Sequence, residues 1–156
     1  TRADTVVNGL ETLSGGAVFP ASGSDWVMVH DAARPFVDPA DIRKLRDEVL
    51  SAGHGAILAM PMADTVKEAS PDRRILATRD RKSLWRAATP QAFRLSELLS
   101  ALRRGTEGVT DESSAMERTG HPVSVVPGST LNFKITTPDD ALIAEAIAES
   151  RLRKHP

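Results

Sequence analysis

The chain has 156 residues, of which 40% are hydrophobic and 26% charged, a composition typical of a globular protein rather than a disordered one. Its 20 basic and 21 acidic residues leave a net charge of −1, which argues against nucleic acid or an anionic membrane as the main partner. The lack of cysteine excludes disulfides, thiolate nucleophiles and cysteine-ligated metal sites. Because we find neither a run of about 18 apolar residues nor a signal-peptide pattern, we expect one cytoplasmic domain over residues 1–156.

The first third of the chain alternates between helical and strand patterns. Apolar residues at helical spacing before the glycines at 15 and 16 predict a helix. Short apolar runs at 26–29 and 55–60 predict two buried strands. Between them, Asp38 followed by Pro39 is a good N-cap pair for a helix that ends near Gly53.

A polar excursion interrupts this pattern at residues 63–85. Two polar strands flank the turn-forming residues 70–72, which predicts a hairpin that projects from the domain as a substrate flap or a dimerisation arm. Thr65 stands at its start and Arg81 near its end, where they could reach an anionic substrate in a neighbouring subunit. The structural alternative is a solvated charged ribbon.

The remaining segments continue the alternation. We expect a helix through Leu95–Leu102, a helix with Thr110 as its N-cap, strands at 123–126 and 133–135, and a last helix capped at 137–140. This alternation favours an α/β fold, in which helices flank a sheet.

Four positions outside the hairpin carry groups suited to phosphate chemistry. Asp31 and Arg34 follow the strand at 26–29, where ligands gather in α/β sheets; the carboxylate could ligate Mg²⁺ and the guanidinium could grip a phosphate. Thr110 begins a helix whose free N–H groups suit phosphate. Lys134 interrupts an apolar strand, where an ammonium must meet an anion or solvent. Turn capping, helix capping and an edge-strand charge are the structural alternatives.

The hairpin and the segments of Asp31, Thr110 and Lys134 are joined by a fifth segment, residues 88–93. We expect it to be a strand that ends in a sharp turn, with the Thr89 hydroxyl free to donate a hydrogen bond. An ordinary strand exit is the structural default for this segment. Together the five segments supply Asp, Arg, Thr and Lys, the groups used in phosphoryl or nucleotidyl transfer, whereas no nucleophile–base pair is evident.

With these residues the chain resembles the 2-C-methyl-D-erythritol 4-phosphate cytidylyltransferases of non-mevalonate isoprenoid synthesis. The resemblance includes Val-His-Asp-Ala-Ala-Arg-Pro at 29–35 and Asn-Phe-Lys-Ile-Thr at 132–136. Four further segments match in the family's order, at 2–6, 64–67, 84–91 and 110–112.

The resemblance implies a Rossmann-like nucleotidyltransferase sheet flanked by helices, and a projecting β-arm at 63–85 that joins two subunits. It also implies CTP and a polyol phosphate as substrates, CDP-methylerythritol and pyrophosphate as products, and Mg²⁺ as the divalent metal. By resemblance, Arg81 and Lys134 orient the substrate phosphate as the catalytic residues, and Asp31 lies beside the metal. The implied nucleotide contacts are Thr5, Asp31 and Ala32, and the implied substrate contacts are Asp31, Arg34, Thr65, Arg81, Thr89, Thr110 and Lys134.

Two departures from the family pattern leave alternatives open. Ser113 and Ser114 replace the usual Ala-Ser, and the family's Gly-rich nucleotide loop, with its Arg and Lys, has no counterpart in this sequence. Either the intact protein carries that loop and is an active transferase, or the 156 residues are a non-catalytic remnant that binds substrate and dimerises. A cytidylyltransferase for another polyol phosphate, such as ribitol 5-phosphate, is the nearest enzymatic alternative, and a sugar-1-phosphate nucleotidyltransferase a more distant one.

Overall fold

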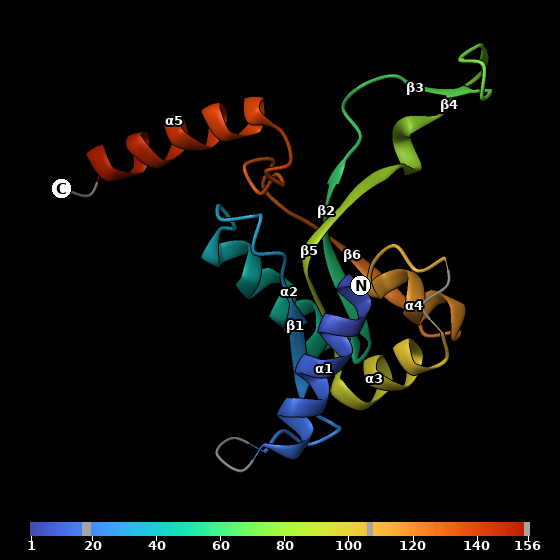
Figure 1. Ribbon diagram of the computed structural model, residues 1–156, viewed down its shortest axis with the longest axis vertical. Helices are drawn as coiled ribbons and strands as arrows, with labels where there is room; N and C mark the ends of the chain where they lie inside the picture. The colour runs from blue at the N-terminus through green and yellow to red at the C-terminus, as the bar shows by residue number, and fades with distance from the viewer. Residues whose placement is uncertain (17–19, 106–107, 155–156) are drawn as a thin grey trace.

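The computed structural model describes residues 1–16, 20–105 and 108–154. Five helices, six strands and one 3₁₀ turn alternate along these residues (Figure 1). In chain order they are α1 (Arg2–Gly15), β1 (Trp26–Val29), α2 (Pro39–Ala52), β2 (Gly55–Pro61), β3 (Val66–Ala69), β4 (Ile75–Arg79), η1 (Arg81–Ser83), β5 (Trp85–Arg94), α3 (Leu95–Arg103), α4 (Glu112–Arg118), β6 (Val123–Pro127) and α5 (Pro138–Lys154).

The central sheet is mixed, with the strand order β1-β5-β2-β6. Strand β5 runs antiparallel to both β1 and β2, and β6 runs parallel to β2. Strands β1, β2 and β6 therefore share one direction, and their carboxyl ends meet at one edge of the sheet. This arrangement places the loop after β1 beside the segment that follows β6.

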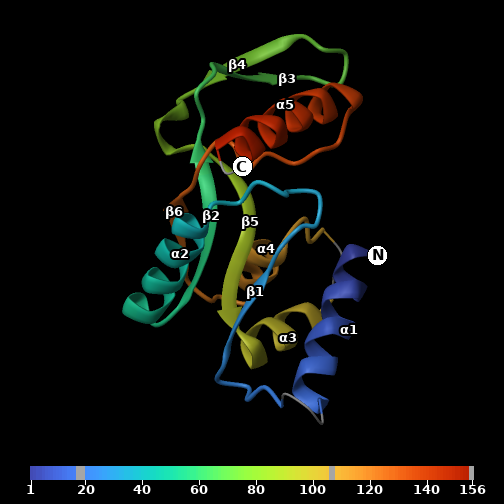
Figure 2. The same ribbon diagram turned by 90° about the vertical axis from the view of Figure 1, so that its left-hand side faces the viewer.

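Helices cover both faces of this sheet (Figures 1 and 2). Because side chains alternate along a strand, Ile57 of β2 packs in the cluster formed with α1, α3 and α4. Its neighbour Leu58 packs on the opposite face, against α2 and Val126 of β6. The expected α/β fold with helices flanking a sheet is confirmed.

Local signals in the sequence explain several boundaries. Asp38 caps α2 by accepting a hydrogen bond from the Ala40 N–H, and Gly53 ends the helix in the left-handed conformation at φ 74°. Strand β2 is buried at its first six residues, as its apolar run predicts. These sequence predictions are confirmed.

Three local expectations are wrong. Strand β1 is an edge strand in the described chain: it pairs with β5 on one side and with no described strand on the other. It is therefore only half-buried, with Met28 exposed. Residues 133–135 form no strand; a single backbone bond, from the Ile135 N–H to the Ala33 carbonyl, ties them to the loop after β1. The N-cap of α4 is Asp111 and not Thr110, because the Asp111 carboxylate accepts from the Ser114 N–H at 3.0 Å.

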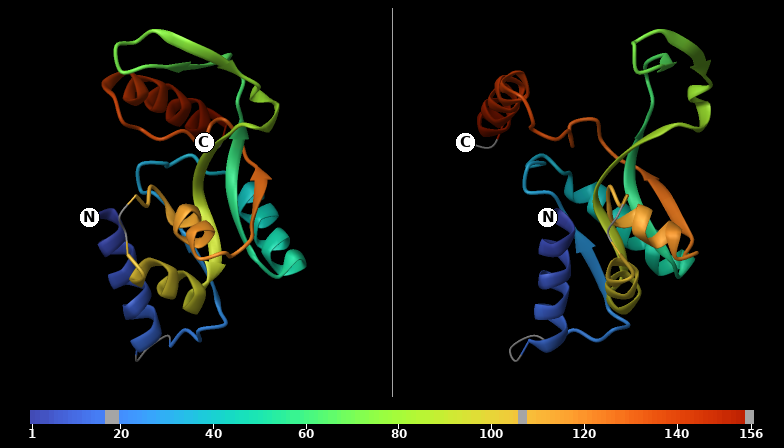
Figure 3. Two further views of the ribbon diagram at one scale, coloured as in Figure 1. Left: turned by 90° about the vertical axis from the view of Figure 1, so that its right-hand side faces the viewer. Right: turned by 45° about the vertical axis from the view of Figure 1, so that its right-hand side comes forward.

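Two elements extend from the same end of the sheet in different directions (Figures 1 and 3). Strands β3 and β4 pair as an antiparallel hairpin, which confirms the hairpin expected within 63–85. Helix α5 lies on the other side, where Arg151 stacks its guanidinium 5.2 Å from the Phe36 ring centroid. No helix in the described ranges is long and apolar enough to cross a membrane.

Candidate active site

Asp31 lies at the centre of a cluster of cations from three separate segments. Its Oδ1 accepts a hydrogen bond from Arg2 Nε at 3.1 Å. Its Oδ2 lies 3.4 Å from Arg34 Nε and 3.3 Å from Lys134 Nζ. Three cationic side chains gathered at one place can pair with the oxygens of a polyanionic ligand.

The surrounding charges keep Asp31 ionised. Burial opposes the charged form, but the positive charges of Arg2 and Lys134 and their hydrogen bonds outweigh it, so the pKa of Asp31 lies below its ordinary value. Asp31 is therefore a carboxylate at neutral pH, available to cations on both oxygens.

A chain of hydrogen bonds fixes the loop that carries Asp31. The Asp31 N–H donates to Thr89 Oγ1 at 2.9 Å, Thr89 Oγ1 lies 3.1 Å from His30 Nδ1, and His30 Nε2 lies 3.0 Å from the Arg34 carbonyl oxygen. A carbonyl only accepts, so Nε2 carries the hydrogen, and in neutral imidazole Nδ1 accepts from the Thr89 hydroxyl. The strand expected at residues 88–93 is confirmed, because they lie within β5, which ends at Arg94 where α3 follows directly. The expectation of a free Thr89 hydroxyl is wrong, because that hydroxyl is engaged by His30 and the Asp31 N–H.

The segment that carries Lys134 is anchored by Asn132, which is fully buried. The Asn132 side chain donates through Nδ2 to the Thr89 backbone carbonyl at 2.8 Å, and the Asn132 backbone carbonyl accepts from Arg34 Nη1 at 2.9 Å. Further upstream, the Ser129 N–H donates to the buried Asp41 carboxylate at 2.7 Å. These bonds hold Lys134 beside Asp31 without a strand.

Two open hollows meet at this cluster. One, of about 310 Å³, includes Thr5 and Ala32, the two residues expected only at the nucleotide. The other, of about 240 Å³, includes Arg34, Thr89 and Thr110, all expected at the second substrate. Three residues line both hollows: Arg2, Asp31 and Lys134. The shared wall is therefore the charged cluster itself.

The donor set at this wall suits a hard cation that is held mainly by its substrate. Among the described residues no three His, Cys, Asp or Glu side chains group as metal ligands. Mg²⁺ often binds through one or two carboxylates plus phosphate oxygens and water, and Asp31 meets that requirement.

Comparison with known proteins identifies the family. The sequence profile described as 2-C-methyl-D-erythritol 4-phosphate cytidylyltransferase matches residues 1–150. The chain belongs to this family. The cytidylyltransferase of Nitrosomonas eutropha is 42% identical over 151 residues, covering 97% of this chain and 64% of that protein. The enzyme of Paraburkholderia phymatum is 47% identical over 152 residues, covering 94% and 63%.

A solved structure agrees with the sequence relatives. A crystal structure of 4-diphosphocytidyl-2C-methyl-D-erythritol synthase superimposes with a TM-score of 0.84 at 39% identity, covering 95% of this chain and 67% of that one. The resemblance to the cytidylyltransferase family is thus confirmed. The chain spans a little under two thirds of the two relatives' length, 64% and 63%.

Two residues that the family pattern assigns to the site lie away from the hollows. Thr65 immediately precedes β3, and Arg81 lies in η1, where its guanidinium donates to the Ala63 carbonyl. Neither lines the hollows beside Asp31 in the same chain. Their part in catalysis stays a prediction that involves a second subunit.

Sequence reasoning missed four polar residues that hold the site together. Arg2 lines both hollows and bonds the buried carboxylate of Glu112. Buried Gln91 donates to Asp111 Oδ2 at 2.8 Å and accepts from the Ser113 N–H at 2.9 Å, which fixes the start of α4, and Asn132 anchors the Lys134 segment. All four stand within the motifs that carry the family resemblance, which is the signal that could have found them.

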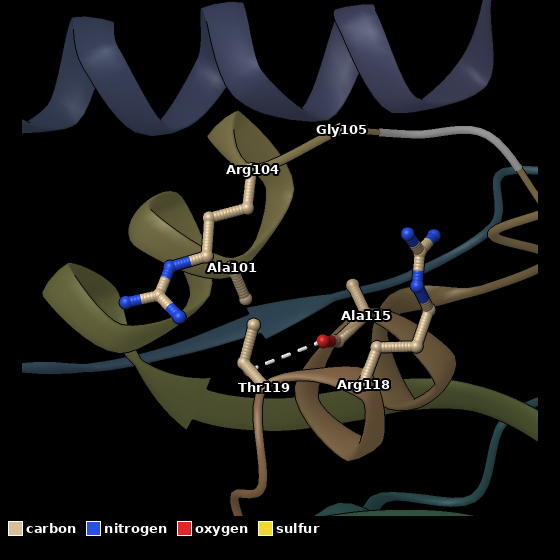
Figure 4. A pocket seen from close by; sticks show the side chains of 6 residues that line it. All are labelled: Ala101, Arg104, Gly105, Ala115, Arg118 and Thr119. Carbon is tan, nitrogen blue, oxygen red and sulfur yellow. Dashed lines mark hydrogen bonds between the residues drawn. The ribbon is translucent and has the colours of Figure 1, made fainter.

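A smaller hollow of about 100 Å³ lies between α3 and α4, away from Asp31. Figure 4 shows that its two arginines, Arg104 and Arg118, point their guanidinium groups in different directions. The Thr119 hydroxyl bonds the Ala115 carbonyl within its own helix turn at 3.2 Å. This hollow lacks the convergent charges of the Asp31 cluster.

Proposed function

We propose that the protein transfers the cytidylyl group of CTP to 2-C-methyl-D-erythritol 4-phosphate, which gives CDP-methylerythritol and pyrophosphate. The supporting observation is the pair of adjacent hollows that share Arg2, Asp31 and Lys134 as one wall. Two substrates seated on either side of that wall would bring their phosphates together. Membership of the family supports the choice of substrates.

The reaction is an in-line displacement at the α-phosphorus of CTP. A phosphate oxygen of methylerythritol phosphate forms the new P–O bond, and the bond to the β-phosphate oxygen breaks as pyrophosphate leaves. Because the nucleophile is already an anion, no general base is required, which agrees with the lack of a nucleophile–base pair in the sequence. Catalysis then depends on alignment and on charge neutralisation.

The residues at the shared wall can supply both. Arg34 and Lys134 would pair with the polyol phosphate, and Thr5 and Ala32 would contact the nucleotide. Asp31 would hold Mg²⁺, which when bound neutralises phosphate charge. The cations preassembled around Asp31 need little rearrangement to meet the substrates.

A second copy of the chain would complete the site. Thr65 and Arg81 lie on or beside the hairpin arm, and Ile75 and Leu76 on β4 are 66% and 63% exposed. Pairing of two arms would cover these apolar side chains and bring Thr65 and Arg81 to the partner's Asp31 cluster. We therefore propose that the enzyme is a homodimer, and light scattering measures its oligomeric state. We also propose that it is cytoplasmic, and cell fractionation measures its location.

Phosphorus NMR tests the proposed reaction directly. With CTP, Mg²⁺ and methylerythritol 4-phosphate we expect the diphosphate signals of the product and a signal of free pyrophosphate. A parallel reaction with ribitol 5-phosphate should be far slower. No turnover of either substrate would contradict the proposed reaction, and faster turnover of ribitol 5-phosphate would reassign the substrate.

A further inference from the structure

We infer that Arg2 is a positioning residue that fixes the Asp31 carboxylate during catalysis, while Arg34 and Lys134 move from Asp31 to the substrate phosphates. The inference rests on the proposed cytidylyl transfer and adds a distinct task for each cation. In this inference the Arg2–Glu112 ion pair stays in place throughout the reaction and holds the Asp31 carboxylate.

The first observation is the strength with which Arg2 is held. Its Nη1 and Nη2 donate to the two carboxylate oxygens of Glu112 at 2.7 and 2.9 Å. Glu112 is only 1% exposed, and this bidentate pair balances its buried charge. Arg2 cannot leave without stranding that charge, so its guanidinium is fixed.

The second observation is that the same guanidinium reaches Asp31. Arg2 Nε donates to Asp31 Oδ1 at 3.1 Å, and Nη2, which donates to Glu112, also lies 3.1 Å from that oxygen. A planar guanidinium can donate hydrogen bonds to two carboxylates from two of its edges, whereas the ammonium of a lysine cannot. Arg2 thereby connects the first turn of α1, the loop after β1 and the first turn of α4.

The third observation is the contrast with the other two cations. Arg34 and Lys134 both face Asp31 Oδ2, at the longer separations of 3.4 and 3.3 Å. Neither cation has a bidentate carboxylate partner of the kind that Arg2 has in Glu112. Arg34 stays anchored through Nη1 to the Asn132 backbone carbonyl at 2.9 Å, so only its Nε would exchange Asp31 for phosphate, whereas the Lys134 side chain is 43% exposed and can turn as a whole. Phosphate oxygens could replace Oδ2 as the partner of both cations, while Oδ1 stays on Arg2.

A double variant separates positioning from folding. Arg2→Met alone would strand the Glu112 charge, so Arg2→Met is combined with Glu112→Gln, which removes both charges of the buried pair. We expect this variant to melt near the parent temperature, yet to lose about 10 to 100-fold in kcat with little change in the KM for methylerythritol phosphate. Glu11→Gln with Arg103→Met, an exposed pair between α1 and α3 at 2.6 Å, is the matched control and should retain the parent kcat.

Arg2→Lys provides a second test should the double variant fail to fold. It keeps the charge balance but loses the planar guanidinium, so kcat should again fall with KM retained. Parent-like kcat in either folded variant would overturn the inference. A fall confined to KM would also overturn it, since Arg2 would then act on ground-state binding.

Crystal structures of the parent and the Arg2→Lys variant test the inference without any turnover. We expect Asp31 Oδ1 on Arg2 in the parent, and a rotated or multiply placed Asp31 side chain in the variant. An unmoved Asp31 in the variant would refute the positioning role. If the parent shows no cytidylyl transfer, the proposed function fails, while the position of Asp31 still decides whether Arg2 fixes it.

Discussion

Asp31 illustrates how one carboxylate organises several cations before any substrate arrives. Arg2, Arg34 and Lys134 come from α1, the loop after β1 and the segment after β6, and Asp31 reduces the repulsion among them while Glu112 also balances the charge of Arg2. Their attraction to Asp31 lowers its pKa in spite of burial. Electrostatic catalysis benefits from such preorganisation, because the donors need not be gathered during the reaction.

Lys134→Ala tests the most exposed of these cations. Removal of its ammonium should lower kcat by about 10² to 10³-fold, the scale found for one preorganised electrostatic donor. The fold should survive, since the side chain is 43% exposed. Steady-state kinetics and circular dichroism measure the two effects, with Arg46→Ala on the exposed face of α2 as the control; near-parent kcat would contradict the assigned role.

Asp41, which holds Ser129 upstream of the Lys134 segment, provides a pH prediction. Burial opposes its ionisation, but bonds from Lys44 and the Ser129 N–H prevail and lower its pKa. A carboxyl group with a folded pKa below the unfolded value of about 3.9 stabilises the protein fully at neutral pH. That contribution disappears as the pH falls through the folded pKa.

Asp41→Asn should therefore lower the free energy of unfolding at pH 7 and change it little near pH 2. A loss of about 2 kcal/mol at pH 7 is expected from the hydrogen bonds made by the charged group. Urea unfolding at several pH values measures the difference, with Asp47→Asn on the exposed face of α2 as the comparison. A difference between parent and Asp41→Asn that stays constant across pH would contradict this account.

At the scale of elements, β2 and β5 pack closely at Gly55, where the glycine lies against the Phe93 ring. A Cβ on Gly55 would stand 2.2 Å from Cδ1 of the fully buried Phe93 ring. Gly55→Ala should therefore cost about 1–3 kcal/mol, the usual penalty for overpacking a core. Gly9→Ala is the matched substitution, because a Cβ there meets nothing within 4 Å in α1 and should add about 0.5–1 kcal/mol of stability. Equal effects in chemical denaturation would contradict the packing argument.

The elements that sequence predicted well are those whose boundaries are set locally. Asp38 and Gly53 define α2 through their own backbone and capping bonds, and the apolar run of β2 follows from burial on both faces. The strand predicted at residues 133–135 does not form. A run of residues that favour strands needs a neighbouring strand to pair with, and here one backbone bond, to Ala33, is made.

The site itself was only partly predictable. Charged residues in motifs identified Asp31, Arg34 and Lys134, since each chemistry-bearing group is visible in one segment. The supporting residues also lie in motifs, but their partnerships are not visible there, because Arg2 and Glu112 stand 110 positions apart and Asn132 bonds Thr89 across 43 positions. Such pairs become visible only when the chain is folded, because no local pattern links them.

At the scale of the whole molecule, the hairpin arm leaves apolar side chains uncovered. Leu76→Glu with Ile75→Glu should convert the proposed dimer to a monomer in light scattering, by burying charge in the contact between arms. Turnover should fall with it, because Thr65 and Arg81 would no longer reach the partner's cluster. Leu50→Glu is the control, because the Leu50 side chain on α2 is already 60% exposed. A monomeric parent, or a fully active monomeric variant, would contradict the completion of the site by a second copy.

A crystal structure with CDP-methylerythritol bound is the most direct test of the site as a whole. We predict the cytidine in the hollow with Thr5 and Ala32, the methylerythritol in the hollow with Arg34, Thr89 and Thr110, and the diphosphate at the wall formed by Arg2, Asp31 and Lys134. Binding of the diphosphate away from this wall would contradict the proposed site.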